Sequence, residues 1–359
     1  MDKAKLMIVG GFLGAGKTTM IHSASGRLKE KGKRIGLLTN DQAPDLVDTA
    51  LLKNLKLDVE EVSGSCFCCN FNGFHESILK VWKSSQADVI LAEPVGSCTD
   101  LVSTIISPFQ KFEGQNFYVA PLSVMADALK LKEVLLNNKT LIHPSSDYIF
   151  FKQLEESDVI LISKIDLIET SELEKINDML VERFPGQKVF LVSSETGEGI
   201  DDWLDFVLTK SDIKRQRIEI DYDVYAEGEA VLGWLNWKME LKSDRADWDK
   251  ILKGIFSELA YRFDTREIGI GHVKILMENN ERYSVGNLTG EGHTLTFRGE
   301  AGEGNESKFT INARVNMEPA KLEALVKDVL VSKLGSIEMN TLSFNCFSPA
   351  YPQPTYKFG

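Results

Sequence analysis

A glycine-rich segment close to the start of the chain constrains the fold of this sequence more than any other feature. Residues 10–19 read GGFLGAGKTT and contain the pattern G-x-x-x-x-G-K-[ST], which begins at Gly11. An apolar run, Leu6–Val9, precedes the segment, and a helix-like stretch, Thr18–Lys31, follows it. This strand–loop–helix context is typical of a phosphate-binding P-loop. The alternative is a glycine turn with an incidental lysine.

The residues of this segment predict a site for a nucleoside triphosphate and Mg²⁺. Glycines allow a tight turn whose consecutive N–H groups point at phosphates, and the following helix adds its positive N-terminal end. Lys17, a predicted catalytic residue, would reach the β- and γ-phosphates, and the Thr18 hydroxyl would bind Mg²⁺. The predicted phosphate-binding residues are Gly11, Gly14, Ala15, Gly16, Lys17, Thr18 and Thr19.

The composition is that of a folded protein with two domains. The chain has 359 residues, of which 43% are hydrophobic and 26% charged, so it can bury a sizeable core. Its net charge of −12 argues against sequence-independent binding to nucleic acid or to an anionic membrane. No apolar run approaches the roughly 18 residues of a membrane span, and the N-terminus lacks a signal-peptide pattern. We therefore expect a cytoplasmic protein that binds neither nucleic acid nor membrane.

Residues 1–210 alternate apolar runs with helical patterns, which predicts an α/β domain of the P-loop NTPase type. Near-continuous apolar strands separated by amphipathic helices indicate a mostly parallel sheet covered on both faces. Strands are expected at Lys5–Val9, Arg34–Thr39, Val89–Ala92, Phe117–Val124, Val159–Ser163 and Lys188–Ser193. Further helices are expected at Phe74–Lys83, Leu101–Phe112, Leu173–Phe184 and Ile200–Leu208.

The pattern changes at a polar stretch, Ser211–Arg217, so a smaller α+β domain is expected over residues 217–359. Strands are predicted at Asp221–Leu241, His272–Glu278, Arg282–Val285, Thr294–Arg298 and Lys308–Asn316, with helices at Trp248–Phe263 and Pro319–Leu334. This order favours a ferredoxin-like arrangement. Gly299–Ser307 is expected to be a flexible surface loop. The tail, Ser348–Gly359, is expected to be extended, covering an edge strand or presenting a docking segment.

An apolar strand that ends in Ser163-Lys164-Ile165-Asp166 predicts a preference for guanine. The sequence resembles the N/T-K-x-D element of GTPases, in which the aspartate accepts from guanine N1–H and the exocyclic amine while the lysine stem packs over the base. Adenine presents the opposite donor and acceptor pattern. The alternative is a lysine–aspartate pair that caps the strand.

A second guanine signal follows one helix later, where KVFLVSS precedes ETGEG. This resembles the GTPase element whose main-chain amides support the base. The predicted nucleotide-binding residues of the two elements are Ser163, Lys164, Asp166, Ser193 and Ser194.

The strand in Asp88–Gly96, DVILAEPVG, ends in the spacing E-x-x-G. The carboxylate of Glu93, a second predicted catalytic residue, can hold Mg²⁺ through water or orient the attacking water. The N–H of Gly96 can donate to a γ-phosphate. The alternative is a helix N-cap region that precedes Asp100.

Three cysteines in the segment GSCFCCN, which are Cys66, Cys68 and Cys69, predict a metal site. Thiolates favour Zn²⁺, Co²⁺, Ni²⁺ or Cu⁺ over hard cations. Tetrahedral zinc needs a fourth ligand, and the candidates are Glu60, Glu61, His75 or a water. Buried small hydrophobic residues or a redox thiol group are the alternatives.

The chain has five cysteines, three of them within four residues, which is not the spacing of a disulfide framework. Cys98 follows the E-x-x-G element, and Cys346 lies near the tail. Both are interpreted as buried thiols outside the site.

Together these motifs resemble the CobW family of P-loop GTPases, relatives of the nickel chaperones HypB and UreG in the SIMIBI class. The segment Thr39–Asp48 takes the place of the family's first switch region, where Asn40-Asp41 is closer to the nickel-chaperone branch. Asp41 is thereby a third predicted catalytic residue. The resemblance covers the C-terminal domain weakly, because the family's histidine-rich stretch is absent there.

The resemblance implies a slow GTPase that traffics metal or assembles a metalloenzyme or cobalamin site. It implies GTP, Mg²⁺ and a thiophilic divalent metal (Zn²⁺, Co²⁺ or Ni²⁺), with the nucleotide state setting the geometry of the cysteines. Its expected partner is a client metalloprotein or a cofactor-assembly protein, and a nucleotide-dependent homodimer is a further candidate. Two other hypotheses are an NTP-dependent enzyme with structural or redox thiols, and a switch or scaffold protein that docks through its C-terminal domain.

Overall fold

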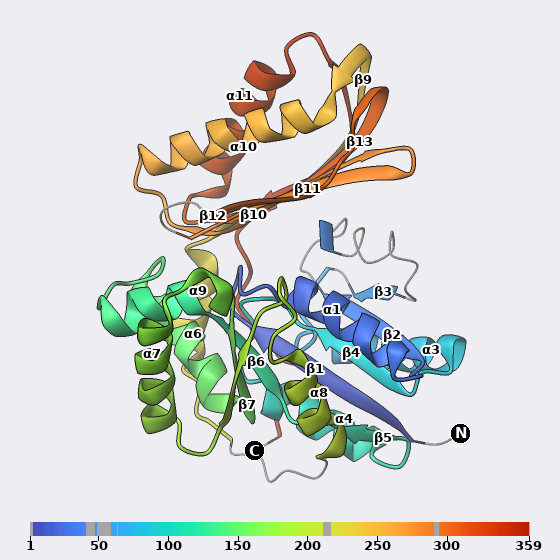
Figure 1. Cartoon of the computed structure of the whole chain (residues 1–359), viewed down its shortest axis with the longest axis vertical. Coiled ribbons are helices and arrows are strands. Elements are labelled where there is room, and N and C mark those ends of the chain that lie inside the picture. Colours follow the sequence, from blue (N-terminus) through green and yellow to red (C-terminus); the bar gives the residue numbers. More distant parts are fainter. Residues whose placement is uncertain are drawn as a thin grey trace. The chain divides into compact units, whose positions relative to one another are not determined.

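The computed structural model describes residues 3–40, 47–48, 59–62, 64–210, 217–290 and 294–358. These residues form two compact units (Figure 1). The first unit takes the described residues of 1–42, 52–225 and 351–359, and the second takes those of 43–51 and 226–350. The tail therefore packs with the first unit, although it follows the second unit in the sequence.

The first unit is built on a parallel sheet with the strand order β3-β2-β4-β1-β6-β7-β8, and β5 also pairs with β1. Its strands are β1 (Ala4–Gly11), β2 (Ile35–Asn40), β3 (Val59–Val62), β4 (Val89–Glu93), β5 (Phe117–Val119), β6 (Ser123–Asp127), β7 (Val159–Ser163) and β8 (Lys188–Val192). The predicted α/β fold is confirmed. The single strand expected over 117–124 is two strands, because Pro121 lies between them and has no N–H for the ladder.

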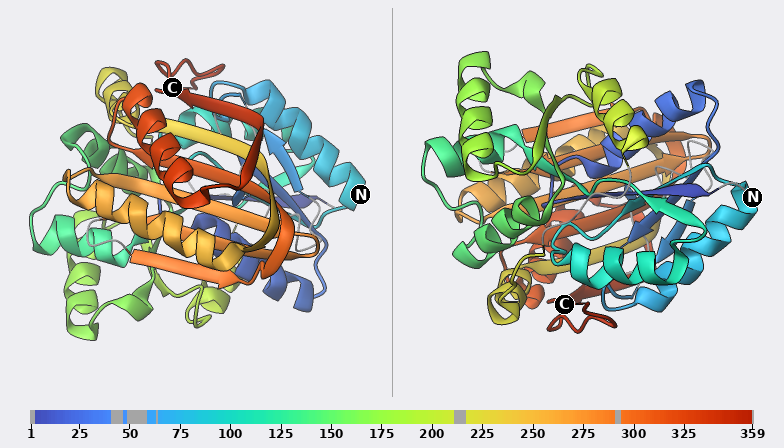
Figure 2. Two further views of the ribbon diagram at one scale, coloured as in Figure 1. Left: turned by 90° about the horizontal axis from the view of Figure 1, so that it is seen from above. Right: turned by 90° about the horizontal axis from the view of Figure 1, so that it is seen from below.

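Helices cover both faces of this sheet (Figure 2). They are α1 (Lys17–Glu30), α3 (Phe71–Ser85), α4 (Ser107–Glu113), α5 (Ala128–Leu131), α6 (Pro144–Glu156), α7 (Thr170–Arg183) and α8 (Ile200–Thr209). The segments η1 (Val102–Ile106) and η2 (Lys132–Leu136) are short π-helices, and η3 (Ile165–Leu167) is a short 3-10 helix. On one face, Met7 and Val9 pack with Leu28 of α1 and Trp203 of α8. The alternate residues of the strand, such as buried Ile8, point to the opposite face of the sheet.

The chain passes to the second unit within α9 (Tyr222–Ala230). The sequence predicted a strand over Asp221–Leu241, and this prediction was wrong for the first half of that range, which is helical. The carboxylate of Asp221 accepts hydrogen bonds from the N–H groups of Asp223 and Val224, which caps a helix start. The strand begins only at Gly233.

The second unit is an antiparallel sheet with the order β12-β11-β10-β13-β9-β14. Its elements are β9 (Gly233–Asp247), α10 (Trp248–Asp264), β10 (Ile270–Asn279), β11 (Arg282–Thr289), β12 (Thr294–Gly299), β13 (Glu303–Val315), α11 (Pro319–Leu334) and β14 (Glu338–Phe347). The strands β10-β13-β9-β14 have the ferredoxin-like order, and the strands β11 and β12 extend the sheet beside β10. Helices α10 and α11 lie on one face of the sheet (Figure 2).

The flexible loop expected over Gly299–Ser307 is largely absent, because β13 already begins at Glu303 opposite Asp247 of β9. Pairing with the long strand β9 overrides the weak strand propensity of these glycine- and glutamate-rich residues. Among the described residues, no helix has both the length and the apolar character needed to cross a membrane.

Candidate functional site

The loop between β1 and α1 has the backbone geometry that its glycines predict. Gly14 and Gly16 adopt φ angles of 77° and 91°, which glycine tolerates far better than other residues. A Cβ atom on Gly11 would lie 2.4 Å from the backbone oxygen of Met125 in β6. Ala15 is buried within the same loop. The loop therefore needs glycine for both its conformation and its close packing.

Lys17 and Thr18, which begin α1, lie beside the end of β4. The Lys17 Nζ donates to the carbonyl oxygen of Gly11 at 2.8 Å, and it lies 3.1 Å from the position of a Cβ on Gly96. The Thr18 hydroxyl lies 3.0 and 3.1 Å from the two carboxylate oxygens of Glu93. Because β1 and β4 are parallel neighbours, the P-loop and the E-x-x-G element meet at one edge of the sheet. Thr19 lies in the first turn of the same helix.

The predicted guanine-reading residues lie close to the P-loop. The Ser163 hydroxyl donates to the carbonyl of Ala15 at 2.8 Å, so this short side chain braces the phosphate loop. Lys164, at φ 60°, pairs with Asp127 through a 2.5 Å contact. The Ser193 hydroxyl donates to the Asp166 carboxylate at 2.5 Å.

The loop that follows β8 is closed around the Ser193 hydroxyl, which accepts from the N–H groups of Glu195 and Thr196 at 3.2 and 3.1 Å. The Ser194 hydroxyl lies 3.9 Å from the sulfur of Met20 in α1. The two predicted guanine elements are thus adjacent, and the second one contacts the helix that follows the P-loop.

A buried lysine of α5, Lys130, is a site candidate that sequence reasoning missed. Its Nζ donates to the carbonyl of Leu13 in the P-loop at 2.6 Å and lies 5.4 Å from the centre of the Phe12 ring. Burial lowers the pKa of Lys130 to about 8, with Asp127 opposing the shift and the positive charges of Lys164 and Lys17 adding to it. The available signal was its position just after a buried strand, at the edge of the sheet that carries the P-loop.

Asp41 lies outside the described residues, whereas Asn40 ends β2 and is buried. The Asn40 amide donates to the carbonyls of Val62 and Ser65 at 2.8 and 2.9 Å. Its oxygen accepts from the N–H of Phe67 at 2.8 Å. One side chain therefore joins the end of β2 to the segment that carries the cysteines.

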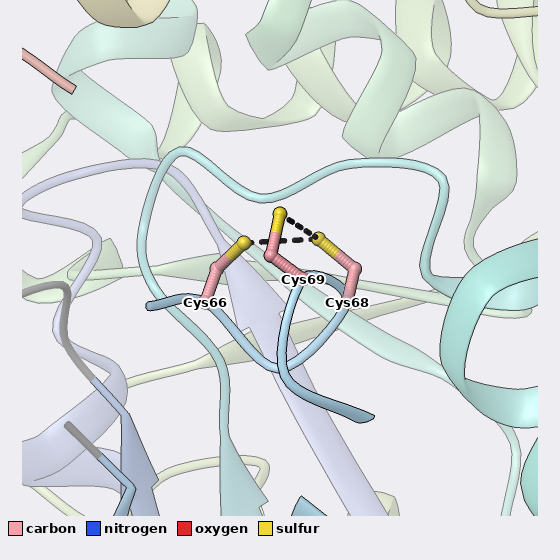
Figure 3. Close-up of side chains that lie close together, drawn as sticks. All are labelled: Cys66, Cys68 and Cys69. Atoms are coloured by element: carbon pink, nitrogen blue, oxygen red, sulfur yellow. Dashed lines mark hydrogen bonds between the residues drawn. The ribbon is translucent and has the colours of Figure 1, made fainter. Parts of the chain in front are cut away.

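The three predicted cysteine ligands lie together on a tight turn (Figure 3). Their sulfur atoms all lie within 4.8 Å of one another, with 3.0 Å from Cys66 to Cys68 and 3.9 Å from Cys68 to Cys69. The turn is closed by the N–H groups of Cys69 and Asn70, which donate to the carbonyl of Cys66. The Asn70 side chain then caps α3, so the spacing C-x-C-C places all three sulfurs just before a helix start.

Hydrogen bonds between the thiols change their proton affinities. Hydrogen bonds from Cys68 and Cys69 hold the pKa of Cys66 well below its ordinary value. The hydrogen bond to Cys66 raises the pKa of Cys68 well above the ordinary range and that of Cys69 to about 11. The cluster therefore favours a single thiolate, on Cys66, and a metal ion that binds all three sulfurs must displace protons.

The fourth ligands suggested by the sequence do not join this group. Glu60 forms an ion pair with Lys80 at 2.8 Å, and His75 Nε2 lies 2.7 Å from a carboxylate oxygen of Glu113. Glu61 is likewise not part of the group of ligand atoms found among the described residues. Partners elsewhere hold Glu60 and His75 away from the cysteines.

The C-terminal tail lies along the cysteine turn, which the sequence did not predict. The Thr355 N–H donates to the carbonyl of Cys68 at 2.8 Å, and its hydroxyl donates to the carbonyl of Cys69 at 3.0 Å. The N–H of Gln353 donates to the sulfur of Cys69 at 3.3 Å. The Tyr356 ring packs edge-on to that of Phe71, with ring centres 5.2 Å apart. The tail therefore covers the cluster rather than an edge strand.

Comparison with known proteins agrees with this geometry. The model of the CobW/HypB/UreG nucleotide-binding domain matches residues 5–191, just over half of the chain. The chain belongs to this family. The matched region of the CobW/HypB/UreG model contains the P-loop, the cysteine turn and Ser163–Asp166.

Individual relatives match part of their length. Over 222 residues the chain is 28% identical to the zinc chaperone CobW of a Sinorhizobium species, covering 55% of this chain and 60% of the relative. Over 186 residues it is 24% identical to the zinc chaperone YjiA of Escherichia coli K12, covering 50% and 54%. The match thus spans little more than half the length of these curated relatives.

Solved structures that resemble the chain include two from this group. The Zn(II)-bound YjiA GTPase of Escherichia coli is 14% identical, with 92% of this chain and 99% of that chain covered and a TM-score of 0.37. The nickel complex of HypB from Helicobacter pylori is 17% identical, with 57% and 86% covered and a TM-score of 0.41.

Proposed function

We propose that this chain is a slow GTPase whose nucleotide state controls a thiophilic divalent metal ion held by Cys66, Cys68 and Cys69. It would pass this ion to a client metalloprotein or to a cofactor-assembly protein. Family membership supports the nucleotide half of this proposal, and the three converging sulfurs support the metal half. Zinc is the first cargo to test because the relatives are named zinc chaperones, although soft thiolates also suit Co²⁺ and Ni²⁺.

The residues at the end of β4 suit Mg²⁺ and a triphosphate. Thr18 and Glu93 offer the hard oxygen ligands that Mg²⁺ prefers, and Mg²⁺ bound there would neutralise charge on the phosphates. Lys17 would exchange the carbonyl of Gly11 for phosphate oxygens. Asp166 would accept from the guanine edge, and Ser193 would hold its carboxylate in place.

The hydrogen bonds made by Asn40 are the main support for coupling between the nucleotide state and the metal site. This residue ends β2 and lies within Thr39–Asp48, the segment in the place of the first switch region, and it binds the backbone on both sides of Cys66. A change in the backbone at the end of β2 would therefore reach the cysteine turn through one side chain. A buried, fully bonded amide transmits such a shift because breaking its bonds costs about 1–3 kcal/mol.

The experiment measures GTP hydrolysis and Co²⁺ binding on the purified full chain. Lys17→Ala should lose hydrolysis while the circular dichroism spectrum is retained, because Lys17 acts on phosphate charge. The Cys68→Ser, Cys69→Ser double variant should lose the thiolate-to-cobalt charge-transfer band. Cys346→Ser, a thiol of the second unit that donates to the carbonyl of Pro319, is the matched control and should keep both signals. Hydrolysis in Lys17→Ala, or an unchanged band in the double variant, would contradict the proposal.

A further inference from the structure

Cys98, which the sequence analysis interpreted as a buried thiol outside the site, lies near the cysteine turn. It ends a tight turn after β4, closed by its N–H, which donates to the carbonyl of Val95 at 2.9 Å. The Gln153 amide of α6 donates to the carbonyls of Gly96 and Cys98 at 3.1 and 2.8 Å. The side chain of Cys98 is 1% exposed. Its position is therefore fixed from two elements.

The surroundings of the Cys98 thiol are those of a ligand. The Cys98 thiol lies near enough to the thiols of Cys66 and Cys68 to lower the pKa of Cys66 and to raise that of Cys68. A buried structural cysteine usually packs as a small hydrophobic residue among apolar groups, whereas the Cys98 thiol lies near two other thiols. None of the four sulfurs is in a disulfide.

We infer that Cys98 is the fourth ligand of the metal site, which it completes together with Cys66, Cys68 and Cys69. This inference rests on the proposed metal cargo and adds the ligand that the three-sulfur turn lacks. Four thiolates form a closed tetrahedral zinc site. With a Zn–S distance of about 2.3 Å, the sulfurs of such a site lie about 3.8 Å apart, close to the 3.9 Å between Cys68 and Cys69. The Cys98 sulfur lies outside the group of three sulfurs that are within 4.8 Å of one another, so it must move toward them when the metal ion binds.

The fourth ligand comes from a different part of the chain than the first three, and this gives it a role. Cys66, Cys68 and Cys69 lie between β3 and α3, whereas Cys98 lies two residues after Gly96. Gly96 packs against Lys17 and Leu13 of the P-loop, where an added Cβ would lie 3.1 Å from Lys17 Nζ. A γ-phosphate that draws the N–H of Gly96 toward it would move Cys98 relative to the other three sulfurs. The nucleotide would thereby select between three and four thiolate ligands.

The experiment counts the sulfur ligands of the full chain directly. X-ray absorption of the Zn²⁺-loaded wild type, with a non-hydrolysable GTP analogue and with GDP, requires no mutation. Four Zn–S scatterers in at least one nucleotide state are expected. Three sulfurs with an oxygen or nitrogen in every state would overturn the role of Cys98 and leave the proposed function standing. A wild type that binds no Zn²⁺ would overturn both.

Variants give an independent measure. Cys98→Ser should lose about a quarter of the thiolate-to-cobalt charge-transfer intensity, and its affinity for Zn²⁺ should fall by at least the roughly 10- to 100-fold that loss of an outer partner costs. Cys346→Ser is the matched control and should match the wild type in both. The circular dichroism spectrum reports whether Cys98→Ser folds, and Cys98→Ala should repeat the spectral loss without a replacement oxygen. Wild-type intensity and Zn²⁺ affinity in folded Cys98→Ser would overturn the inference.

Discussion

The Thr18 hydroxyl of α1 lies 3.0 and 3.1 Å from the two carboxylate oxygens of Glu93 at the end of β4. Both side chains are buried, and they join the P-loop helix to the strand that leads to Gly96 and Cys98. One short segment, Glu93–Cys98, therefore joins the candidate nucleotide site to the cysteine that we propose as the fourth metal ligand.

Replacing Glu93 by glutamine should lower kcat for GTP hydrolysis by on the order of 100-fold, because a carboxylate that orients water or holds Mg²⁺ is lost. GTP binding should change less, since the phosphate amides and Lys17 remain. Glu60→Gln, which removes a charge paired with Lys80, is the control. Single-turnover hydrolysis checks this prediction, and wild-type turnover in Glu93→Gln would exclude Glu93 from the chemistry.

Asp166→Asn should weaken GTP binding by about 2–3 kcal/mol, because a charge-assisted pair of hydrogen bonds is lost. ATP binding should be weak in both proteins. Asp205→Asn, on the exposed side of α8 beside Lys31, should bind GTP like the wild type. Calorimetry with both nucleotides makes the comparison, and equal affinity of the wild type for GTP and ATP would remove the guanine assignment of Ser163–Asp166.

The affinity for GTP should fall as pH rises through about 8, because the pKa of buried Lys130 is lowered to about 8. Phosphate charge beside this lysine raises its pKa, so nucleotide binding takes up a proton in this range. The lowered pKa also determines how the stability of the nucleotide-free protein changes with pH. The unfolded chain, with an ordinary value of 10.5, binds more protons between pH 8 and 10.5, so the contribution of Lys130 to stability rises with pH over this range.

Calorimetry at pH 8 in buffers of different ionisation enthalpy measures this proton uptake. Lys130→Met should abolish the part of the uptake that belongs to Lys130, while titration of the nucleotide itself is common to both proteins. Identical proton uptake in Lys130→Met and the wild type would show that Lys130 is not coupled to the phosphates.

Removal of residues 351–359 should accelerate the transfer of bound Zn²⁺ to a chelator several-fold, because the tail covers the cysteine turn. Thr355→Ala should give a smaller acceleration, since it removes the hydroxyl's hydrogen bonds with the carbonyl of Cys69 and the N–H of Phe71 but leaves the rest of the tail in place. Tyr351→Phe, which loses a surface contact with Asp223, is the control. Stopped-flow chelation gives the rates, and an unchanged rate after truncation would mean that the tail is no barrier.

Local patterns in the sequence predicted the parallel sheet, because each strand and its loop carry their own signal. The end of a strand is also where Glu93, Ser163 and Asp166 had to lie, so their convergence followed from the order of the sheet. The sequence pattern missed features that depend on distant contacts. The roles proposed for Cys98 and Lys130 depend on neighbours from other strands and loops at the same edge of the sheet.

The position of the tail and the helix α9 were also not predicted from local sequence patterns. Thr355 contacts Cys68, which lies far from it in the sequence, and a local hydrophobic pattern cannot predict such a contact. The helix at Tyr222–Ala230 depends on the side chain of Asp221, a cap that the apolar alternation of the region concealed.

If the nucleotide state controls the metal site, the affinity for Zn²⁺ must differ between the GTP-bound and GDP-bound protein. The dissociation constant for Zn²⁺ is measured by chelator competition in excess Mg²⁺, once with GDP and once with a non-hydrolysable GTP analogue. The two values should differ by about 5- to 150-fold, and the affinity for the GTP analogue relative to GDP should change by the same factor when Zn²⁺ is added. Equal Zn²⁺ affinity in the two nucleotide states would show that the nucleotide does not control the metal site.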